Sequence, residues 1–370
     1  MDKCAFLNKA GIGLSLGLTV SWGVFAESNT QPVIATSIKP VTMIVEAIAG
    51  EHAKVNQIVS NNASPHDFAL RPSDIRKIHQ ADTVVWVGES LETFMEKVLV
   101  NGNKFDSSIE WLTLSNMTLR DFAEHNHGEE HDHEEHDHEE HDHEEHDHEE
   151  HDHEEHDHEE HDHDEHEHEH EHEHEHEHEE HEEHEEQDEH DQHAEGGHHH
   201  EGVDPHVWLD PDNAIVLAKA VTEKLSALSP DNKTHYEQNL TVFIESVESA
   251  ELKINGVLKQ KEALNYMVFH DAYGYFEDHF NVHPVDVITV NPDRKPGAKK
   301  ITEIKTMIQQ GKVECVFTEP QFNPAIVSVL LEGSQAKTAE LDPLATSINL
   351  GPLAYHNFLL SLGEKIQSCD

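Results

Sequence analysis

The chain has 370 residues and a formal net charge of −53 at pH 7, from 77 Asp and Glu residues against 24 Lys and Arg. This balance excludes a protein whose basic surface binds nucleic acid, and it opposes adsorption to an anionic lipid surface. Residues 124–201 hold 41 of the acidic residues and no Lys or Arg, so the rest of the chain carries only −12. That remainder is long enough for two domains of about 150 residues, each with its own core.

Residues 1–26 have the features of a secretory signal peptide. Lys3 and Lys9 lie in the leading segment, AGIGLSLGLTV forms a short apolar core, and Val24-Phe25-Ala26 fits a small-x-small cleavage site. A membrane anchor is the alternative, but the apolar run is shorter than the roughly 20 residues that a membrane span needs. We therefore expect a cleaved signal and a soluble, extracytoplasmic mature chain that starts at Glu27.

Between Pro32 and the acidic run, short β-branched segments alternate with helical ones. Ser73 is expected to cap a helix and Gly50 to end one. The alternation predicts a parallel sheet covered by helices. Strands are expected at 32–37, 55–59 and 83–88, and helices at 40–50, 74–81 and 89–100.

The run from His125 to His200 holds 30 of the 39 histidines, with six copies of HDHEE at 131–160 and alternating His-Glu at 166–179. Imidazole and carboxylate are the common borderline and hard metal ligands, so their interleaving predicts a chelator with many overlapping sites. The run has no apolar residue larger than Ala194 and cannot build a core, so we expect it to be disordered when metal-free. A solvated acidic linker is the simpler alternative.

After this run, residues 210–228 start with Asp-Pro and predict a helix of about five turns, and a second long helical stretch follows Pro230. Strand-helix alternation then resumes. Strands are expected at 266–270, 285–290, 313–318 and 337–342, and helices at 272–280, 299–311, after Asn323 and from Pro352.

The expected architecture is α/β, with two lobes that each contain a mostly parallel sheet covered by helices. The boundaries are a signal peptide at 1–26, an N-terminal lobe at 27–123 and 203–210, a loop at 124–202 within that lobe, a connector helix at 211–230, and a C-terminal lobe at 231–370. The mature chain keeps Cys315 and Cys369. Two cysteines in an oxidising compartment favour one disulfide bond.

Of the nine histidines outside the run, His66, His206 and His270 stand out. His66 follows one predicted strand, His270 closes another, and His206 lies between the run and the connector helix. Ligands of open α/β sheets bind beyond the carboxyl ends of strands, where Glu319 and Asp342 also lie. We expect these side chains to face one cleft between the lobes. The other six histidines outside the run are interpreted as solvated or capping residues: His52, His79, His235, His279, His283 and His356.

Three imidazoles with one carboxylate or water satisfy a tetrahedral Zn²⁺ site. Manganese sites prefer more oxygen ligands, which favours zinc, although ligand softness alone does not exclude nickel or copper.

Seven motifs, in order and at matching spacing, are similar to those of the zinc-binding substrate-binding proteins of bacterial zinc ABC transporters, the ZnuA type. They are SPHDFALRPSD, ADTVVWVG, HVWLDP, VFHDAYGYF, VNPDRKPGA, VFTEPQF and LDPL. The resemblance covers residues 27–370. It implies two α/β lobes joined by a rigid helix, with zinc held in the cleft between them by His66, His206 and His270.

The resemblance also implies a periplasmic location, delivery of zinc to a permease in the inner membrane, and a Cys315–Cys369 disulfide. Some zinc-binding members have Glu immediately before the first ligand histidine, where this chain has Pro65. The fourth ligand is therefore either Asp342, which aligns with a carboxylate of manganese-binding relatives, or water. Glu319 is expected to lie behind the ligands, and we expect a monomer.

Two other functions fit some of these features. A zinc hydrolase also uses three protein ligands and a bound water, with Glu319 as a possible base, but no second motif supplies a substrate site. An extracytoplasmic zinc buffer or adhesin would share the signal peptide and the His-rich run. We therefore expect a transport protein without enzymatic activity.

Overall fold

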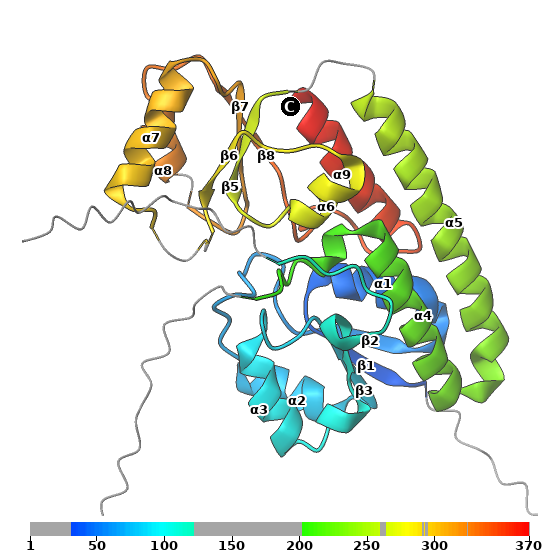
Figure 1. Ribbon diagram of the computed structural model, residues 1–370. Coiled ribbons are helices and arrows are strands. Elements are labelled where there is room, and N and C mark those ends of the chain that lie inside the picture. Colours follow the sequence, from blue (N-terminus) through cyan, green and yellow to red (C-terminus); the bar gives the residue numbers. More distant parts are fainter. Residues whose placement is uncertain are drawn as a thin grey trace, which may run out of the picture. The chain divides into compact units, whose positions relative to one another are not determined.

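The computed structural model describes residues 31–121, 202–259, 264–290, 292, 295–323 and 325–369 (Figure 1). The predicted signal peptide and the predicted disordered run from 125 to 200 lie outside these residues. Within the described residues, no helix is both long and apolar enough to cross a membrane.

The first sheet contains four parallel strands in the order β2-β1-β3-β4. The strands are β1 (Val33–Thr36), β2 (Lys54–Gln57), β3 (Thr83–Trp86) and β4 (Ile109–Glu110). The first three confirm the predicted strands, whereas the two-residue β4 has too little sequence for a period-2 pattern and was not predicted.

Successive side chains of these strands enter different cores. Ala35, Val84 and Trp86 pack with α2 (Pro72–Gln80) and α3 (Thr93–Asn101), whereas Ile34 and Val85 face the larger core around α1 (Lys39–Ala49). Such alternation is expected of a sheet covered on both faces.

Two helix starts differ from the prediction, and one helix end agrees with it. Helix α1 ends at Ala49 and is followed by the C-cap residue Gly50, whose φ of 55° suits glycine. Helix α2 starts at Pro72 with Arg71 as its N-cap, so Ser73 lies inside the helix, and the Asp74 carboxylate accepts from Arg71 N at 3.1 Å. Helix α3 starts at Thr93, after a turn, instead of at residue 89.

The second sheet repeats the topology of the first, with four parallel strands in the order β6-β5-β7-β8. The strands are β5 (Tyr266–His270), β6 (Asp286–Thr289), β7 (Cys315–Thr318) and β8 (Lys337–Glu340), and the helices are α6 (Gly274–Phe280), α7 (Ala298–Gln309), α8 (Ala325–Leu331) and α9 (Ala354–Ser368). Figure 1 shows α7 and α8 together beside this sheet. Their Ile304, Ile308, Val327 and Leu330 form a core with Met267 of β5. These elements confirm the predicted second α/β lobe.

Two long helices, α4 (Pro211–Leu228) and α5 (Lys233–Leu258), join the two sheets along the chain. Helix α4 packs against α1 and α5, whereas α5 packs against α1, α4 and also α9. The predicted connector at 211–230 corresponds to α4, whose N-cap residue Asp210 also lies beside His279 of α6, and α5 contacts elements of both lobes as well. Its 26 residues span about 39 Å, which is long enough to run past both groups of helices.

Short 3-10 helices and one disulfide complete the described structure. The 3-10 helices are Gly50–His52, Phe105–Ser107, Trp111–Thr113, Val207–Leu209 and Pro230–Asn232. Cys315, at the start of β7, is bonded to Cys369, at the end of α9, with a Cα–Cα distance of 6.0 Å. The disulfide confirms the predicted pairing and ties the last helix to the second sheet.

Candidate metal centre

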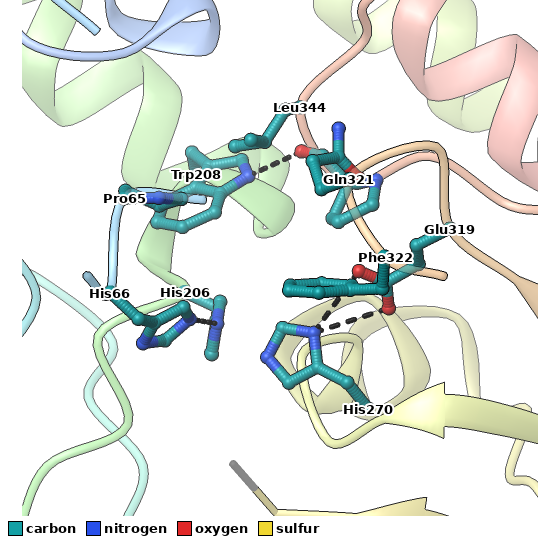
Figure 2. A pocket seen from close by; sticks show the side chains of 10 residues that line it. Pro65, His66, His206, Trp208, His270, Glu319, Gln321, Phe322 and Leu344 are labelled. Atoms are coloured by element: carbon teal, nitrogen blue, oxygen red, sulfur yellow. Dashed lines mark hydrogen bonds and ion pairs between the residues drawn. The ribbon is translucent and has the colours of Figure 1, made fainter. Parts of the chain in front are cut away.

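Three histidines from separate segments line one small pocket (Figure 2). His66 lies in the loop between β2 and α2, His206 immediately precedes the 3-10 helix Val207–Leu209, and His270 is the last residue of β5. Strand β5 lies between β6 and β7, which are reached by connections on opposite sides of it, so His270 sits at the position where open parallel sheets bind ligands.

The three imidazoles converge. The ring centroids are 5.3 Å apart for His66 and His206, 5.3 Å for His66 and His270, and 4.9 Å for His206 and His270. One nitrogen of each ring lies within 4.8 Å of the others, and the Nε2 atoms of His66 and His206 are 3.4 Å apart. Two ligands of a tetrahedral zinc ion lie about 3.3 Å apart, so a small contraction would bring these nitrogens to a common ion.

Two of the rings are held from behind by carboxylates. His206 Nδ1 lies 2.6 Å from Asp204 Oδ1, and His270 Nδ1 lies 3.1 and 3.2 Å from the two oxygens of Glu319. A proton on Nδ1 satisfies these contacts and leaves the Nε2 lone pair for a metal, which is the usual arrangement of a ligating histidine. His270 Nε2 is buried and has no hydrogen-bond partner among the described residues.

Burial lowers the pKa of His270, but the neighbouring Glu319 carboxylate opposes this effect, and the pKa is raised overall. The negative charges around this ring therefore favour a cation. A metal ion on Nε2 would be stabilised by the same negative charges that favour a second proton on this ring when no metal is bound.

Asp204 connects the centre to both ends of the segment that contains the His-rich run. Its Oδ2 accepts from Arg120 Nη1 at 2.7 Å, and its backbone oxygen accepts from Tyr275 Oη at 2.9 Å. Arg120 N donates to the same Tyr275 Oη at 3.1 Å, and Asp121 and Val203 form an antiparallel bridge. Residues 121 and 203 are thus paired three residues before His206.

Sequence reasoning did not identify Asp204. The sequence did contain a signal for it. The side chain of an Asp often accepts a hydrogen bond from the backbone N–H of the residue two positions later, in an Asx turn. His206 N donates to Asp204 Oδ1 at 3.0 Å in this way.

Asp342, the predicted alternative fourth ligand, lies outside the group of three histidines. Its Oδ1 accepts from Gln321 Nε2 and Leu344 N, each at 3.0 Å, and its Oδ2 accepts from Thr346 Oγ1 at 2.6 Å and Thr346 N at 2.5 Å. Both carboxylate oxygens are therefore engaged in holding the loop that follows β8.

The remaining wall of the pocket is mostly apolar. Trp208 donates from Nε1 to Pro343 O at 2.8 Å, which links the His206 segment to the loop after β8, and Phe322 packs edge-on against the His270 ring. The space that this partly open pocket offers is about 10 Å³, enough for a single water molecule or ion. The geometry suits a monatomic guest.

The interpretation of two other histidines was wrong. His356 is only 8% exposed, and its Nδ1 bonds to Ser246 O at 2.7 Å, so it is a buried residue between α5 and α9. His279 is 19% exposed and is paired with both Asp210 and Glu251, so it is neither a freely solvated nor a capping residue. Both were misread because their partners lie far away in the sequence.

The chain is similar to known proteins over nearly its whole length. A model of the ZnuA family, described as zinc-uptake complex component A periplasmic, matches residues 34–369. The high-affinity zinc uptake system protein ZnuA of Haemophilus influenzae is 38% identical over 338 residues, covering 91% of this chain and 92% of that protein. The protein of the same name from Yersinia pestis is 32% identical over 338 residues, covering 91% of this chain and 90% of that protein.

A crystal structure of ZnuA shares the fold, with a TM-score of 0.63 at 19% identity, and the match covers 91% of this chain and 98% of that one. The family model and the relatives each extend over nearly the whole chain. The chain therefore belongs to the ZnuA family of periplasmic zinc-uptake components.

Proposed function

We propose that the protein captures Zn²⁺ in the periplasm and delivers it to an ABC permease for high-affinity zinc uptake. The observation that carries this proposal is the convergence of His66, His206 and His270 in a pocket of ion size. Three nitrogen ligands suit zinc better than manganese, which prefers oxygen. The names of the relatives, high-affinity zinc uptake system proteins, point to the same cargo.

The fourth coordination position is proposed to be either Asp342 or water. The four hydrogen bonds that Asp342 accepts favour water, because ligation by Asp342 would require some of them to break. Glu319 is proposed to hold the His270 ring without touching the ion. A bound, exchangeable cargo is better served by an open position than by a closed set of four protein ligands.

Periplasmic export by the predicted signal peptide at 1–26 and docking on an inner-membrane permease are parts of the same proposal. The run from 125 to 200 is proposed to collect zinc weakly close to the tight site. A tethered reservoir raises the local zinc concentration without any direct contact.

Growth under zinc limitation tests the function. In a bacterium deleted for its own zinc-uptake binding component, together with the cognate permease, this protein should restore growth in chelator-treated medium. His270→Ala should fail at equal protein level, whereas His79→Ala, on the exposed side of α2, should succeed. Equal rescue by His270→Ala would reject cleft-based uptake, and a protein that binds zinc without supporting growth would be a buffer or adhesin.

A further inference from the structure

A second group of potential metal ligands lies outside the three-histidine centre. Asp210 is the N-cap of α4, Asp212 lies in the first turn of that helix, and His279 belongs to α6. One ligand atom from each lies within 4.8 Å of the other two. Glu251 of α5 completes the surroundings from the other side of the His279 ring.

The two nitrogens of His279 have different environments. Nε2 lies 2.7 Å from Glu251 Oε1, a short hydrogen bond, whereas Nδ1 lies 3.4 Å from Asp210 Oδ1. The second distance exceeds the 2.7–2.9 Å of a strong charge-assisted hydrogen bond. It is close to the roughly 3.3 Å between two ligands of one tetrahedral zinc ion.

The His279 ring thus repeats the arrangement seen in the three-histidine centre. There, Asp204 and Glu319 each hold one nitrogen of a ring whose other nitrogen faces the site. At His279, Glu251 takes the holding position on Nε2, Nδ1 faces Asp210, and Asp212 belongs to the same group. A carboxylate on the far nitrogen fixes the tautomer and makes the near nitrogen a better metal ligand.

The charges of the group also favour a cation. Three carboxylates, from Asp210, Asp212 and Glu251, surround one imidazole, and Lys219 is the cation that acts on Asp212 from the same helix. The positive end of the α4 dipole opposes a cation, but by less than these carboxylates attract one.

From this geometry we propose that Asp210, Asp212 and His279 bind a second divalent metal ion, with Glu251 positioning the imidazole. A nitrogen with two carboxylates suits zinc, and water would complete the tetrahedron. The ion would join α4 to α6 beside the α5 helix, so its role is to brace these helices. It is independent of the transported zinc and does not rest on the proposed function.

Anomalous diffraction tests the site directly. Crystals of the full chain, grown at a buffered free zinc concentration and measured on both sides of the zinc absorption edge, locate each ion by position. We expect one peak at His66, His206 and His270 and a second peak between Asp210, Asp212 and His279. The second peak should be lost in Asp212→Asn and in His279→Gln, with the first peak unchanged. Asp212 is exposed, so its substitution leaves the fold intact even if His279→Gln does not.

The control is His283→Gln, an exposed histidine four residues from His279, which should keep both peaks. A wild-type crystal with zinc at the three histidines but none at the second group would overturn this inference and leave the proposed function standing. A second peak that persists in Asp212→Asn and His279→Gln would overturn the ligand set. A second peak without the first would instead contradict the proposed function.

Discussion

His206 illustrates how one buried residue can act through another. Asp204 is fully buried and accepts from both the Nδ1 and the backbone N of His206. It therefore sets the tautomer and the orientation of the ring, while Arg120 neutralises its other oxygen. Carboxylates in this position commonly affect metal affinity without touching the metal.

Replacing Asp204 with Asn should weaken zinc binding at the three-histidine centre by roughly 10–100-fold, because the amide cannot hold the Nδ1 proton as strongly. Competition with a chromophoric zinc chelator measures this change. Asp278→Asn is the matched control, since Asp278 pairs with Arg120 through Nε but is far more exposed. An equal loss of zinc affinity in both variants would show that Asp204 acts through Arg120 instead of through His206.

Glu92 predicts a pH dependence of stability that is separate from metal binding. It is fully buried, its Oε2 accepts from Val87 N and Gly88 N, and burial raises its pKa to about 7 from 4.5. An acid with a raised pKa in the folded state binds more protons there than in the unfolded chain. Protonated Glu92 therefore stabilises the folded protein at low pH. This contribution to the free energy of unfolding is lost as pH rises from about 4.5 to about 7, and the free energy does not change further through Glu92 above that range.

In chelator, the free energy of unfolding of Glu92→Gln should rise relative to wild type by about 3 kcal/mol between pH 4.5 and 8. Urea unfolding at several pH values measures the difference. Glu89→Gln, an exposed neighbour, separates burial from the loss of a charge. A difference that does not vary with pH would show that Glu92 is ionised in the folded protein throughout.

At the scale of elements, the contact between α5 and α9 depends on a glycine. A Cβ on Gly363 of α9 would lie 2.9 Å from Ile254 Cγ2 of α5, closer than carbon atoms can pack. Both residues are buried, so neither side chain can move into solvent. Helix α5 contacts both lobes, and this close approach fixes its distance from the second one.

Gly363→Ala should therefore lower the free energy of unfolding by about 1–3 kcal/mol, although alanine is the better helix former. Gly256→Ala is the control, because Gly256 is an exposed residue of α5 with nothing within 4 Å of its added Cβ. That change should raise stability by about 0.5–1 kcal/mol. Similar effects of the two substitutions in denaturant unfolding would contradict close packing at Gly363.

Most of the elements could be predicted from the sequence, because buried parallel strands appear as short β-branched runs between helical segments. The start of α2 was assigned incorrectly, and the contacts of α5 with both lobes were not predicted. Capping at Arg71 depends on the Asp74 side chain, and the role of α5 depends on where α1 and α9 pack. Such tertiary relations leave no periodic trace in a single sequence.

The candidate site shows the same division. His66 and His270 could be selected because they lie beyond or at the end of predicted strands, and His206 because it lies between the His-rich run and the connector helix. Asp204 left a local signal that was not used. Glu251 and the role of His279 depend on contacts between distant segments. Asp342 and Glu319 share the strand-end position, yet Asp342 supports a loop and Glu319 holds His270. A position beyond a strand predicts proximity to the site but not the role of the side chain.

At the scale of the whole molecule, the His-rich run predicts a second class of weak, pH-sensitive zinc binding. Its imidazoles lie among carboxylates, which favour the protonated form of the ring. Zinc must displace these protons, so its binding to the run weakens as pH falls. Calorimetry of the full chain should show several weak events at neutral pH, and most should disappear at about pH 5, where free histidine is protonated. A stoichiometry of one zinc per chain at neutral pH would make the run a spacer.

The central claim is that the tight zinc site is the three-histidine centre and not the His-rich run. Residues 121 and 203 are paired, so removing 125–200 leaves ends that a short connection can close. Calorimetric zinc titration of this deletion should retain one tight event, tighter than any other. His66→Ala, His206→Ala and His270→Ala should each weaken it by more than about 100-fold, beyond the cost of losing a supporting carboxylate, and His79→Ala should not. Loss of the tight event in the deletion itself, or its survival in His206→Ala, would contradict the account.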